Sequence, residues 1–473
     1  MDKVKNLDNI QNIYMVGIKG VGMTALVEIL KSQGKKISGS DEAEPFFTDQ
    51  ILNKLKIKVY EGFSKNNLKH KRKVDLVIHS TAYNKENNEE LQVAGEKGFP
   101  VMSYPEVLGL LFNSKIGIAV CGTHGKTTTT AMLALVMKDA GLDPTAQIGS
   151  KVKQLDSSVL IGGSDYMLIE ADEYQNKLAH YNPKMAILTN LDFDHPDYFE
   201  DFEKYKEVFK KFVRKIPANG TLVVWGESAS TLEVAIEAKC KVIVYGFFSK
   251  KFDDGSEKFG ANEMMIHDIR EKFEQAGNKK IEFVFVPEKL KLKIPGRHNL
   301  LNATGSWALA KSLGILEEKA IESLVNFEGT ARRMEKIGER KGAIVMDDYA
   351  HHPEEVKASL EALKEKYPKR NLICVFHPHT FTRTKALFSD FAQSFSKADE
   401  VIVLDIYGSA REKQGGVNSE ELVDKMKMYH EDVLHLATLD DAYEDLKDRV
   451  GSKDLVVTMG AGNVCELASR LAS

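Results

Sequence analysis

The segment from residue 116 to residue 130 has the residue types and spacing of a site for a nucleoside triphosphate. Gly122 and Gly125 allow backbone N–H groups to approach phosphate oxygens, and Lys126 supplies a positive charge. Thr127 offers a hydroxyl group for Mg²⁺. A strict P-loop has glycine at position 120, where this chain has valine, so we interpret the segment as a variant phosphate loop. Three further polar residues of the loop are expected to contact the nucleotide: Thr123, His124 and Thr128.

Carboxylates gather at the ends of two apolar runs further along the chain. Glu170 ends the first run and is followed by two more acids within three residues, and the second run, 185–190, leads into a loop that contains His195. Mg²⁺ with phosphate balances such a concentration of negative charge, and Glu170 is the best candidate ligand because it ends its strand directly. Histidine is a softer ligand than Mg²⁺ prefers, so the spacing alone favours a polar loop residue at position 195.

Two loops in the last third of the chain carry many groups that can bind an anion or transfer a proton. Each follows a short apolar run, 343–346 in one case and 372–376 in the other. Four histidines within these loops, beside an arginine, favour a functional site over isolated structural residues. A third loop of this kind contains Arg411. The candidate residues of the first two loops are Asp348, Tyr349, His351, His379 and Arg383.

A pair of asparagines, Asn299 and Asn302, opens a predicted helix. Residues three positions apart lie on one face of a helix, so the two side chains point the same way. An asparagine side chain has both a donor and an acceptor, as reading the edge of an adenine base requires. The alternative is that Asn299 is an ordinary helix cap, and the pattern supports both interpretations equally.

The elements that position these groups begin with an N-terminal strand, turn, helix and strand. An apolar run, 13–17, leads into a turn with Gly20 and Gly22, and the second strand ends at Asp41. This order is typical of a site for a nucleotide diphosphate, although the glycine spacing is not that of a dinucleotide site. A packing turn without a ligand is the alternative. Ser80 is a further candidate, since ligands bind at the carboxyl ends of parallel strands.

Alternating strand-like and helical stretches predict an α/β fold throughout the chain. The length of 473 residues exceeds what one core can hold, so we expect three domains. They are a Rossmann-like domain over residues 1–112, a central P-loop ATPase domain with a mainly parallel sheet over 113–326, and a Rossmann-like α/β domain over 327–473. A charged, strand-rich excursion over 247–293 has no chemistry that the sequence identifies.

The composition is that of an ordinary globular protein, with 43% hydrophobic and 28% charged residues. A net charge of −4 gives no reason to expect a nucleic acid as partner. The N-terminus has no signal-peptide pattern and no run approaches the roughly 18 apolar residues of a membrane span, so we expect no membrane association. The 4 cysteines are far apart, and three of them lie in or beside apolar patterns that suit buried thiols in the reducing cytoplasm: the four are Cys121, Cys240, Cys374 and Cys465.

Together these segments resemble the Mur ligase family, the ATP-dependent amide-forming enzymes of peptidoglycan precursor synthesis, over nearly the whole chain. The resemblance is carried by the phosphate loop and by Glu170–Glu173, Gly296–Asn302, Arg332–Arg333 and Asp347–Pro353. Within the family, the turns at 16–23, 38–41 and 376–384 are most similar to members that use L-alanine. The segment 190–197 is closer to members that attach the tripeptide L-alanyl-γ-D-glutamyl-meso-diaminopimelate, but the histidine-rich loops favour L-alanine.

The resemblance implies a ligase that joins L-alanine to the lactyl carboxylate of UDP-N-acetylmuramate through an acyl phosphate, releasing ADP and phosphate. It implies ATP and Mg²⁺ as cofactors, the two small molecules as substrates, and a monomer or weak homodimer. Lys126 and Arg333 would neutralise the transferred phosphoryl group. Asp348 or a neighbouring histidine would accept a proton from the attacking amine.

The resemblance also implies how the other candidates divide among the ligands. Thr127, Glu170 and His195 would bind Mg²⁺. His298, Asn299 and Asn302 would bind adenine, and Gly20, Gly22, Asp41 and Ser80 the UDP end of the sugar nucleotide. Arg383 would hold the alanine carboxylate, with Tyr349, His351 and His379 around it, because a planar guanidinium matches a carboxylate.

Three other functions are compatible with parts of the sequence. A nicotinamide dehydrogenase would explain the N-terminal glycine turn but not the phosphate loop or the histidine-rich loops. A P-loop kinase or simple ATPase would use Lys126 and Glu170 without needing residues 347–383. A binding protein on a ligase fold is disfavoured because every candidate phosphate and metal residue is of a chemically competent type.

Overall fold

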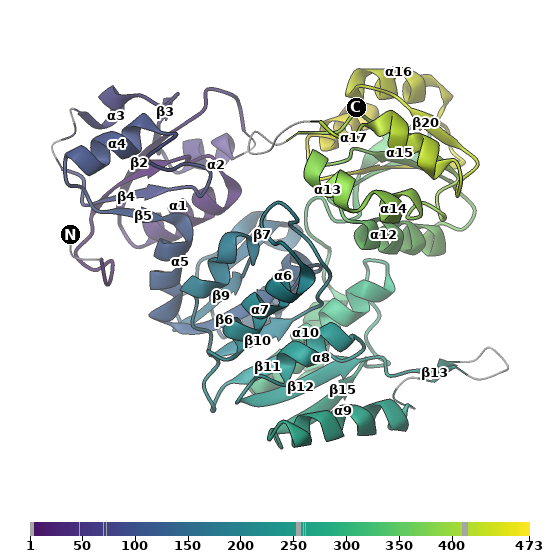
Figure 1. Cartoon of the computed structure of the whole chain (residues 1–473), viewed down its shortest axis with the longest axis horizontal. Helices are drawn as coiled ribbons and strands as arrows, with labels where there is room; N and C mark the ends of the chain where they lie inside the picture. The colour runs from purple at the N-terminus through teal and green to yellow at the C-terminus, as the bar shows by residue number, and fades with distance from the viewer. Residues whose placement is uncertain are drawn as a thin grey trace.

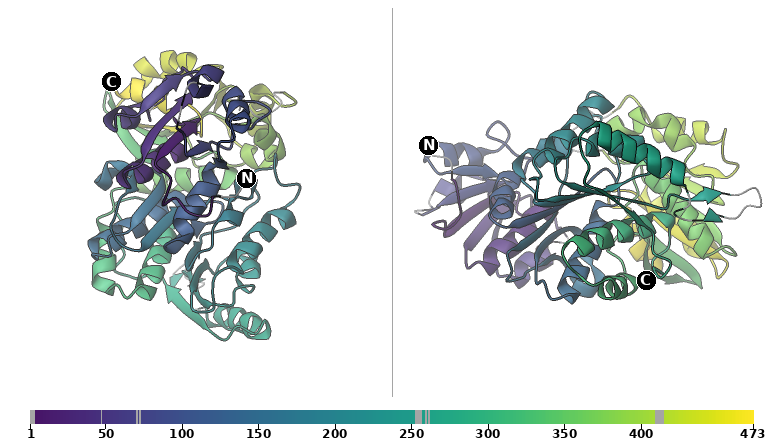
Figure 2. Two further views of the ribbon diagram at one scale, coloured as in Figure 1. Left: turned by 90° about the vertical axis from the view of Figure 1, so that its left-hand side faces the viewer. Right: turned by 90° about the horizontal axis from the view of Figure 1, so that it is seen from below.

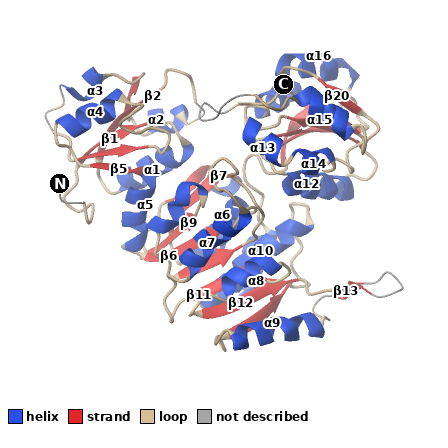
Figure 3. Cartoon of the chain, viewed as in Figure 1, coloured by secondary structure: helices blue, strands red, loops and turns tan. Residues whose placement is uncertain are grey.

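The computed structural model describes residues 4–46, 48–69, 71, 73–251, 257–258, 260, 262–408 and 415–473. Three sheets of 5, 8 and 6 strands, each flanked by helices, form three successive α/β units (Figure 3). The predicted α/β class with three domains and mainly parallel sheets is confirmed, whereas the boundaries at 112 and 326 stay predictions. Arg411 lies outside the described residues. Within the described ranges, no helix is long and apolar enough to cross a membrane.

The first unit has five parallel strands: β1 (Asn12–Val16), β2 (Lys36–Asp41), β3 (Lys58–Glu61), β4 (Leu76–His79) and β5 (Val101–Ser103), in the order β3-β2-β1-β4-β5. Helix α1 (Val21–Ser32) follows the glycine turn directly and buries Leu26 and Leu30 against the sheet. The chain then turns at Gly34, whose φ of +79° suits a residue without a side chain. The other helices are α2 (Asp49–Lys54), α3 (Lys65–Lys69), α4 (Glu89–Glu96) and α5 (Tyr104–Asn113).

The central unit has eight strands: β6 (Ile116–Cys121), β7 (Thr145–Val152), β8 (Ser157–Leu160), β9 (Tyr166–Glu170), β10 (Met185–Leu188), β11 (Thr221–Trp225), β12 (Lys241–Gly246) and β15 (Ile281–Phe285). Their order is β15-β12-β11-β10-β6-β9-β7-β8, and only the β7–β8 pair is antiparallel. The carboxyl ends of β6, β9 and β10 therefore meet at one edge of the sheet, which brings the phosphate loop and the acidic loops together.

Helices cover both faces of the central sheet. They are α6 (Lys126–Asp139), α7 (Phe202–Val213), α8 (Ala229–Ala235), α9 (Glu263–Gln275), α10 (Arg297–Ser312) and α11 (Glu317–Val325), with short 3-10 turns at Lys153–Leu155 and Tyr174–His180. Every residue of α6 from Thr127 to Met137 is buried, since α6 packs against α10 and α11 as well as the sheet. The excursion at 247–293, predicted as strand-rich, includes β15, but among its described residues the longest element is the 13-residue helix α9. The same excursion holds the short pair β13 (Lys250–Lys251) and β14 (Glu257–Lys258).

The third unit has six strands: β16 (Glu335–Arg340), β17 (Ala343–Asp348), β18 (Asn371–Phe376), β19 (Glu400–Val403), β20 (Val433–His435) and β21 (Asp454–Met459). The order is β16-β17-β21-β18-β19-β20, and only β16 is antiparallel to its neighbour. The helices are α12 (Pro353–Lys366), α13 (Phe381–Ala386), α14 (Phe388–Ala392), α15 (Ser419–Met426), α16 (Leu439–Arg449) and α17 (Cys465–Ala472). The helices α13 and α14 are separated at Leu387, where the chain leaves helical geometry.

The first and third units lie on opposite sides of the central unit (Figures 1 and 2). Helix α5 leads from the first sheet into β6 and packs on the central unit, where Gly109 fits closely against the backbone of His180. The connection to the third unit is held by β7, since the Ala331 N–H donates to the Lys151 carbonyl over 2.8 Å. Three of the cysteines are buried as expected, and Cys465 is partly exposed.

Candidate functional site

The phosphate loop connects the end of β6 to the start of α6. Gly125 is the N-cap residue of α6 with a φ of 77°, and a Cβ at this position would lie 2.5 Å from Asn302 Oδ1. Glycine is therefore required here by both conformation and space. The His124 N–H donates to Asn190 Oδ1 over 2.8 Å, which fixes the loop to the segment after β10. The first N–H groups of a helix have no partner within the helix, and the helix dipole favours an anion beside them.

Lys126 lies at the start of α6 and is held by the protein through three contacts. Its ammonium group donates to the carbonyl oxygens of Gly122 and Thr123 over 2.6 and 3.0 Å, and to Glu173 Oε2 over 3.1 Å. Burial alone would lower the pKa of Lys126, but the nearby carboxylates, Glu173 first among them, raise it above its ordinary value. The side chain is therefore a fixed positive charge at the phosphate loop.

Thr127 and Glu170 lie side by side, as the sequence predicts for two Mg²⁺ ligands. Thr127 Oγ1 donates to Glu170 Oε1 over 2.9 Å, and the Gly149 N–H donates to Glu170 Oε2 over 2.6 Å. Burial raises the pKa of Glu170, while the charge of Lys126 opposes that rise. A hydroxyl and a carboxylate oxygen are hard donors that suit Mg²⁺.

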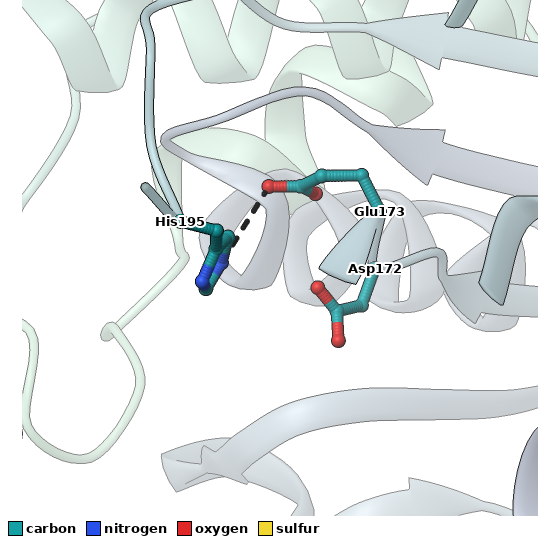
Figure 4. Close-up of side chains that lie close together, drawn as sticks. All are labelled: Asp172, Glu173 and His195. Atoms are coloured by element: carbon teal, nitrogen blue, oxygen red, sulfur yellow. Dashed lines mark ion pairs between the residues drawn. The ribbon is translucent and has the colours of Figure 1, made fainter. Parts of the chain in front are cut away.

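His195 lies close to Asp172 and Glu173, the two acids that follow Glu170. Figure 4 shows Glu173 and His195 pointing toward each other, and the atoms Glu173 Oε1 and His195 Nε2 are 3.9 Å apart. One ligand atom each from Asp172, Glu173 and His195 lies within 4.8 Å of the others, a spacing at which they could share a metal ion. The His195 backbone has a φ of 57°, which turns the ring back onto Tyr174 at a centroid distance of 4.5 Å.

A first cavity, of about 360 Å³, lies between the first unit and the central unit. From the first unit it is lined by the glycine turn, by Ser80 and Thr81, and by Tyr104. From the central unit it is lined by Lys126, Gln147, Gly149, Glu170, Asp172, Lys177 and Tyr181. The predicted residues Gly20, Gly22 and Ser80 thus share one cavity with Lys126 and Glu170.

Asp41 is the one predicted residue for the UDP end that does not line this cavity. Its carboxylate accepts hydrogen bonds from the backbone N–H groups of Lys19 and Glu42 over 2.6 and 2.9 Å. Burial raises its pKa. In the structure Asp41 therefore holds the backbone of the glycine turn from outside the cavity, and direct contact with a ligand stays a prediction.

A second cavity, of about 260 Å³, lies between the central unit and the third unit. It is lined by the predicted nucleotide residues His124, Gly125, Thr128, His298, Asn299, Asn302 and Arg333, and also by Trp225, Asp348 and Glu355. Burial lowers the pKa of His298 to about 4, so this histidine is neutral near pH 7. A further hollow, of about 680 Å³, lies between α9 and β15 and contains none of the predicted site residues.

The two asparagines of α10 line the second cavity, and the capping alternative for Asn299 is wrong. Gly296 is the N-cap residue of α10, and no side chain caps this helix. The Asn299 Nδ2 group donates instead to the Pro295 carbonyl over 2.6 Å, and Asn302 Nδ2 donates to Asn299 Oδ1 over 3.3 Å. These bonds fix the orientation of both amides at the cavity wall.

The four residues predicted to hold the amino acid come together in the third unit. The rings of Tyr349 and His351 are 5.1 Å apart, and those of His351 and His379 are 6.4 Å apart. Arg383 Nη1 lies 3.4 Å from His379 Nδ1. Burial lowers the pKa of His351 to about 3, so this ring is neutral.

Asp348 ends β17 and lines the second cavity. Its carboxylate accepts hydrogen bonds from Ser359 Oγ over 2.9 Å and from the N–H groups of Met334 and Ala350 over 3.2 and 2.9 Å. Burial nevertheless raises its pKa to about 6. Asp348 therefore connects Met334, before β16, to Ala350 in the loop after β17. Its raised pKa makes it a stronger base than an ordinary aspartate.

Ion pairs connect the central unit to the third unit, and sequence reasoning missed the two that are most buried. His124 Nδ1 lies 3.0 Å from Glu355 Oε1 on α12, and Arg383 contacts Asp194 through Nε and Nη2 over 3.0 and 2.9 Å. Burial acts to raise the pKa of Asp194, but the positive charge of Arg383 holds it well below its ordinary value. The only sequence signal for Glu355 is its place in the first turn of a helix, where an acid is common in any protein.

Three Mur ligase family profiles match successive parts of the chain. Residues 12–116 match the profile described as Mur ligase family, catalytic domain, residues 120–310 match the Mur ligase middle domain, and residues 332–462 match Mur ligase, glutamate ligase domain. The chain is 38% identical to the UDP-N-acetylmuramate–L-alanine ligase of Desulfitobacterium hafniense, over 97% of this chain and 99% of that relative. The chain belongs to the Mur ligase family. The ligase of the same name from Treponema pallidum is 37% identical over 97% of this Mur ligase chain and 95% of its own length.

Solved structures of Mur ligases have the same fold. UDP-N-acetylmuramate-alanine ligase from Thermotoga maritima matches with a TM-score of 0.75 and 25% identity, over 98% of both chains. A murein peptide ligase from Psychrobacter arcticus matches with a TM-score of 0.67 and 25% identity, also over 98% of both chains. The three-unit architecture is therefore that of the family.

Proposed function

We propose that this Mur ligase is an ATP-dependent enzyme that joins L-alanine to the lactyl carboxylate of UDP-N-acetylmuramate, in the synthesis of peptidoglycan precursors. The observation that carries the proposal is that the phosphate loop forms a wall of both cavities, through Lys126 in the first and through His124 and Gly125 in the second. An acid in the first cavity can thus meet a nucleotide in the second, with the phosphate loop between them. The relatives with 36–38% identity over nearly the whole chain carry the name of this activity.

A carboxylate is a poor electrophile, so the acid must first be activated as an acyl phosphate. In our proposal ATP lies in the second cavity, with its adenine near His298, Asn299 and Asn302 and its phosphates along residues 122–128. Lys126 and Arg333 would neutralise the charge that develops during phosphoryl transfer. Thr127, Glu170 and His195 would hold Mg²⁺, which would supply further positive charge at the phosphates.

The amine of L-alanine then attacks the acyl phosphate, and phosphate leaves. We propose that Arg383 binds the carboxylate of alanine beside Tyr349, His351 and His379. Asp194 already occupies Nε and Nη2 of Arg383, which fixes the plane of the guanidinium and leaves Nη1 toward His379. The amine must be neutral to attack, and Asp348, with a pKa of about 6, is the proposed proton acceptor.

The decisive experiment measures phosphate release from ATP with UDP-N-acetylmuramate and a panel of acceptors. We expect turnover with L-alanine and little with other amino acids or with L-alanyl-γ-D-glutamyl-meso-diaminopimelate. Turnover with the tripeptide alone would assign the chain to the alternative muropeptide ligase. ATP consumption that needs no amine would instead indicate a simple ATPase. Saturable binding of NADH at micromolar concentration would favour the dehydrogenase interpretation.

A further inference from the structure

Two cationic side chains line the first cavity in the described part of the chain, Lys126 and Lys177. Lys126 belongs to the phosphate loop, and its ammonium group has three hydrogen-bond acceptors within the protein. An ammonium group has three donors, so those of Lys126 are all engaged. Lys177 belongs to the 3-10 turn Tyr174–His180, after the acids that follow β9, and has a different set of contacts.

Lys177 retains donors that can face a ligand. Its one hydrogen bond among the described residues goes to Asp172, whose side chain is 38% exposed at the cavity wall. Its ammonium group also lies 5.5 Å from the centre of the Tyr174 ring. Two of its three N–H donors are therefore available, and only 15% of the side chain is exposed, so its position is restricted.

The backbone that presents Lys177 adopts an unusual conformation. The two preceding residues, Gln175 and Asn176, have φ values of 55° and 56°, the left-handed region that residues with a Cβ rarely occupy. Consecutive left-handed residues persist only where the surrounding structure determines them, and such strain gathers at ligand sites. The turn directs Lys177 back toward Asp172 and the cavity instead of into solvent.

We propose that Lys177 binds the reacting carboxylate of the acid substrate and positions it for phosphorylation. This inference rests on the proposed function, because it takes the substrate to be a sugar nucleotide with a carboxylate. The first unit contributes the glycine turn to one wall of the cavity, and Lys126 and Glu170 form the opposite wall. Lys177 lies on the same wall as Lys126 and Glu170, where the acid must be placed to receive a phosphoryl group. Lys177 is thus a positioning residue.

A pair of ligands that differ by the carboxylate tests this proposal. Binding of UDP-N-acetylmuramate and of UDP-N-acetylglucosamine, which lacks the lactyl group, is measured by calorimetry without ATP or alanine. We expect Lys177→Met to weaken binding of the first ligand roughly tenfold or more, as loss of one charge-assisted hydrogen bond does, and to leave binding of the second unchanged. Lys177→Arg should restore part of the lost affinity. Lys211→Met, which removes an exposed lysine of α7, is the matched control and should change neither affinity.

Two results would overturn the proposal. Equal weakening for both ligands would mean that Lys177 supports the diphosphate site or the local fold, and unchanged binding of both would mean that it contacts neither ligand. The thermal midpoint of each variant, measured alongside, identifies loss of folding. Failure of the proposed function is a separate outcome, since wild-type protein would then consume no ATP with UDP-N-acetylmuramate and L-alanine.

Discussion

The first and third units contact the central unit through surfaces of different chemistry. Between the first and central units one buried apolar cluster is continuous, and it includes Leu26 and Phe112 on one side and Leu178 and Tyr205 on the other. The third unit has buried clusters of its own, formed by residues from 334 onward. Its contact with the central unit includes the pairs His124–Glu355 and Asp194–Arg383.

This difference indicates which part of the molecule moves. A large apolar interface holds two units in one arrangement, because separation would expose apolar surface to water. A polar interface can open at lower cost, since water replaces the lost hydrogen bonds. We expect the sugar-nucleotide cavity to keep its shape, and the cavity beside the third unit to open for exchange of nucleotide and amino acid.

The phosphate loop lines the cavities at both interfaces, so removing the Lys126 charge from it should have the largest effect. Lys126→Ala removes the fixed charge beside Glu173 and should reduce kcat/KM for amide formation by a factor of at least about 100, typical for loss of one preorganised group. Phosphate release assays measure this effect. Circular dichroism should show an unchanged fold, and near-normal turnover would remove Lys126 from the phosphate site.

The apolar interface should respond to a core deletion by losing stability. Phe112 is fully buried in α5, and its ring lies 5.8 Å from that of Tyr181. Phe112→Ala should lower the free energy of unfolding by about 3–5 kcal/mol, as deletion of a buried aromatic ring does. Differential scanning calorimetry would show this as a lower midpoint. A small change there, with the units separating in small-angle scattering, would contradict the view that this interface is rigid.

The polar interface should respond to substitution by changing affinity for the acceptor. Arg383→Lys retains the charge but loses the planar fork, so we expect the KM for L-alanine to rise about tenfold, the loss of roughly one hydrogen bond to a charged group. The KM for ATP should change much less. Steady-state kinetics with each substrate varied in turn separates the two. An unchanged KM for L-alanine would place the amino-acid pocket elsewhere.

The smallest effect should be a pH dependence of the central–third contact. Burial acts to lower the pKa of His124, but Glu355, then Asp192 and Asp194, raise it above 6.5 overall. The His124–Glu355 contribution is therefore fully present below pH 6.5 and is lost as the pH rises through the raised pKa of His124. Small-angle scattering from pH 6 to 9 should show gradual opening.

The His124–Glu355 ion pair is also lost at low pH, when Glu355 becomes protonated. Burial acts to raise the pKa of Glu355, but His351, His124 and Arg333 hold it well below 4.5, so its contribution is present above pH 4.5 and is lost only as the pH falls through that lowered pKa. His124→Gln should abolish the opening between pH 6 and 9 and leave the apolar interface unaffected. Persistence of the pH response in that variant would assign it to another group.

The local pattern of the chain was sufficient to predict several elements. The apolar run before Gly122 and the buried helix after Gly125 define a strand, a turn and a helix, because those residues interact mainly with their neighbours in sequence. The longer runs of the third unit are likewise predictable as β17, β18, β19 and β21. The edge strands β16 and β20 were missed, since they are half-exposed and lack a continuous apolar run.

The sequence alone determined which residues could do chemistry: the phosphate loop, the acids after β9 and the histidine-rich loops of the third unit. Only the tertiary structure decided which of them meet. It placed His195 beside Asp172 and Glu173, joined Arg383 to Asp194, and turned Lys177 into the first cavity. The physical reason is the sequence range over which each interaction acts. Backbone conformation and apolar periodicity are set within a few residues. A contact between residues 189 positions apart, such as Asp194 and Arg383, depends on how whole sheets pack.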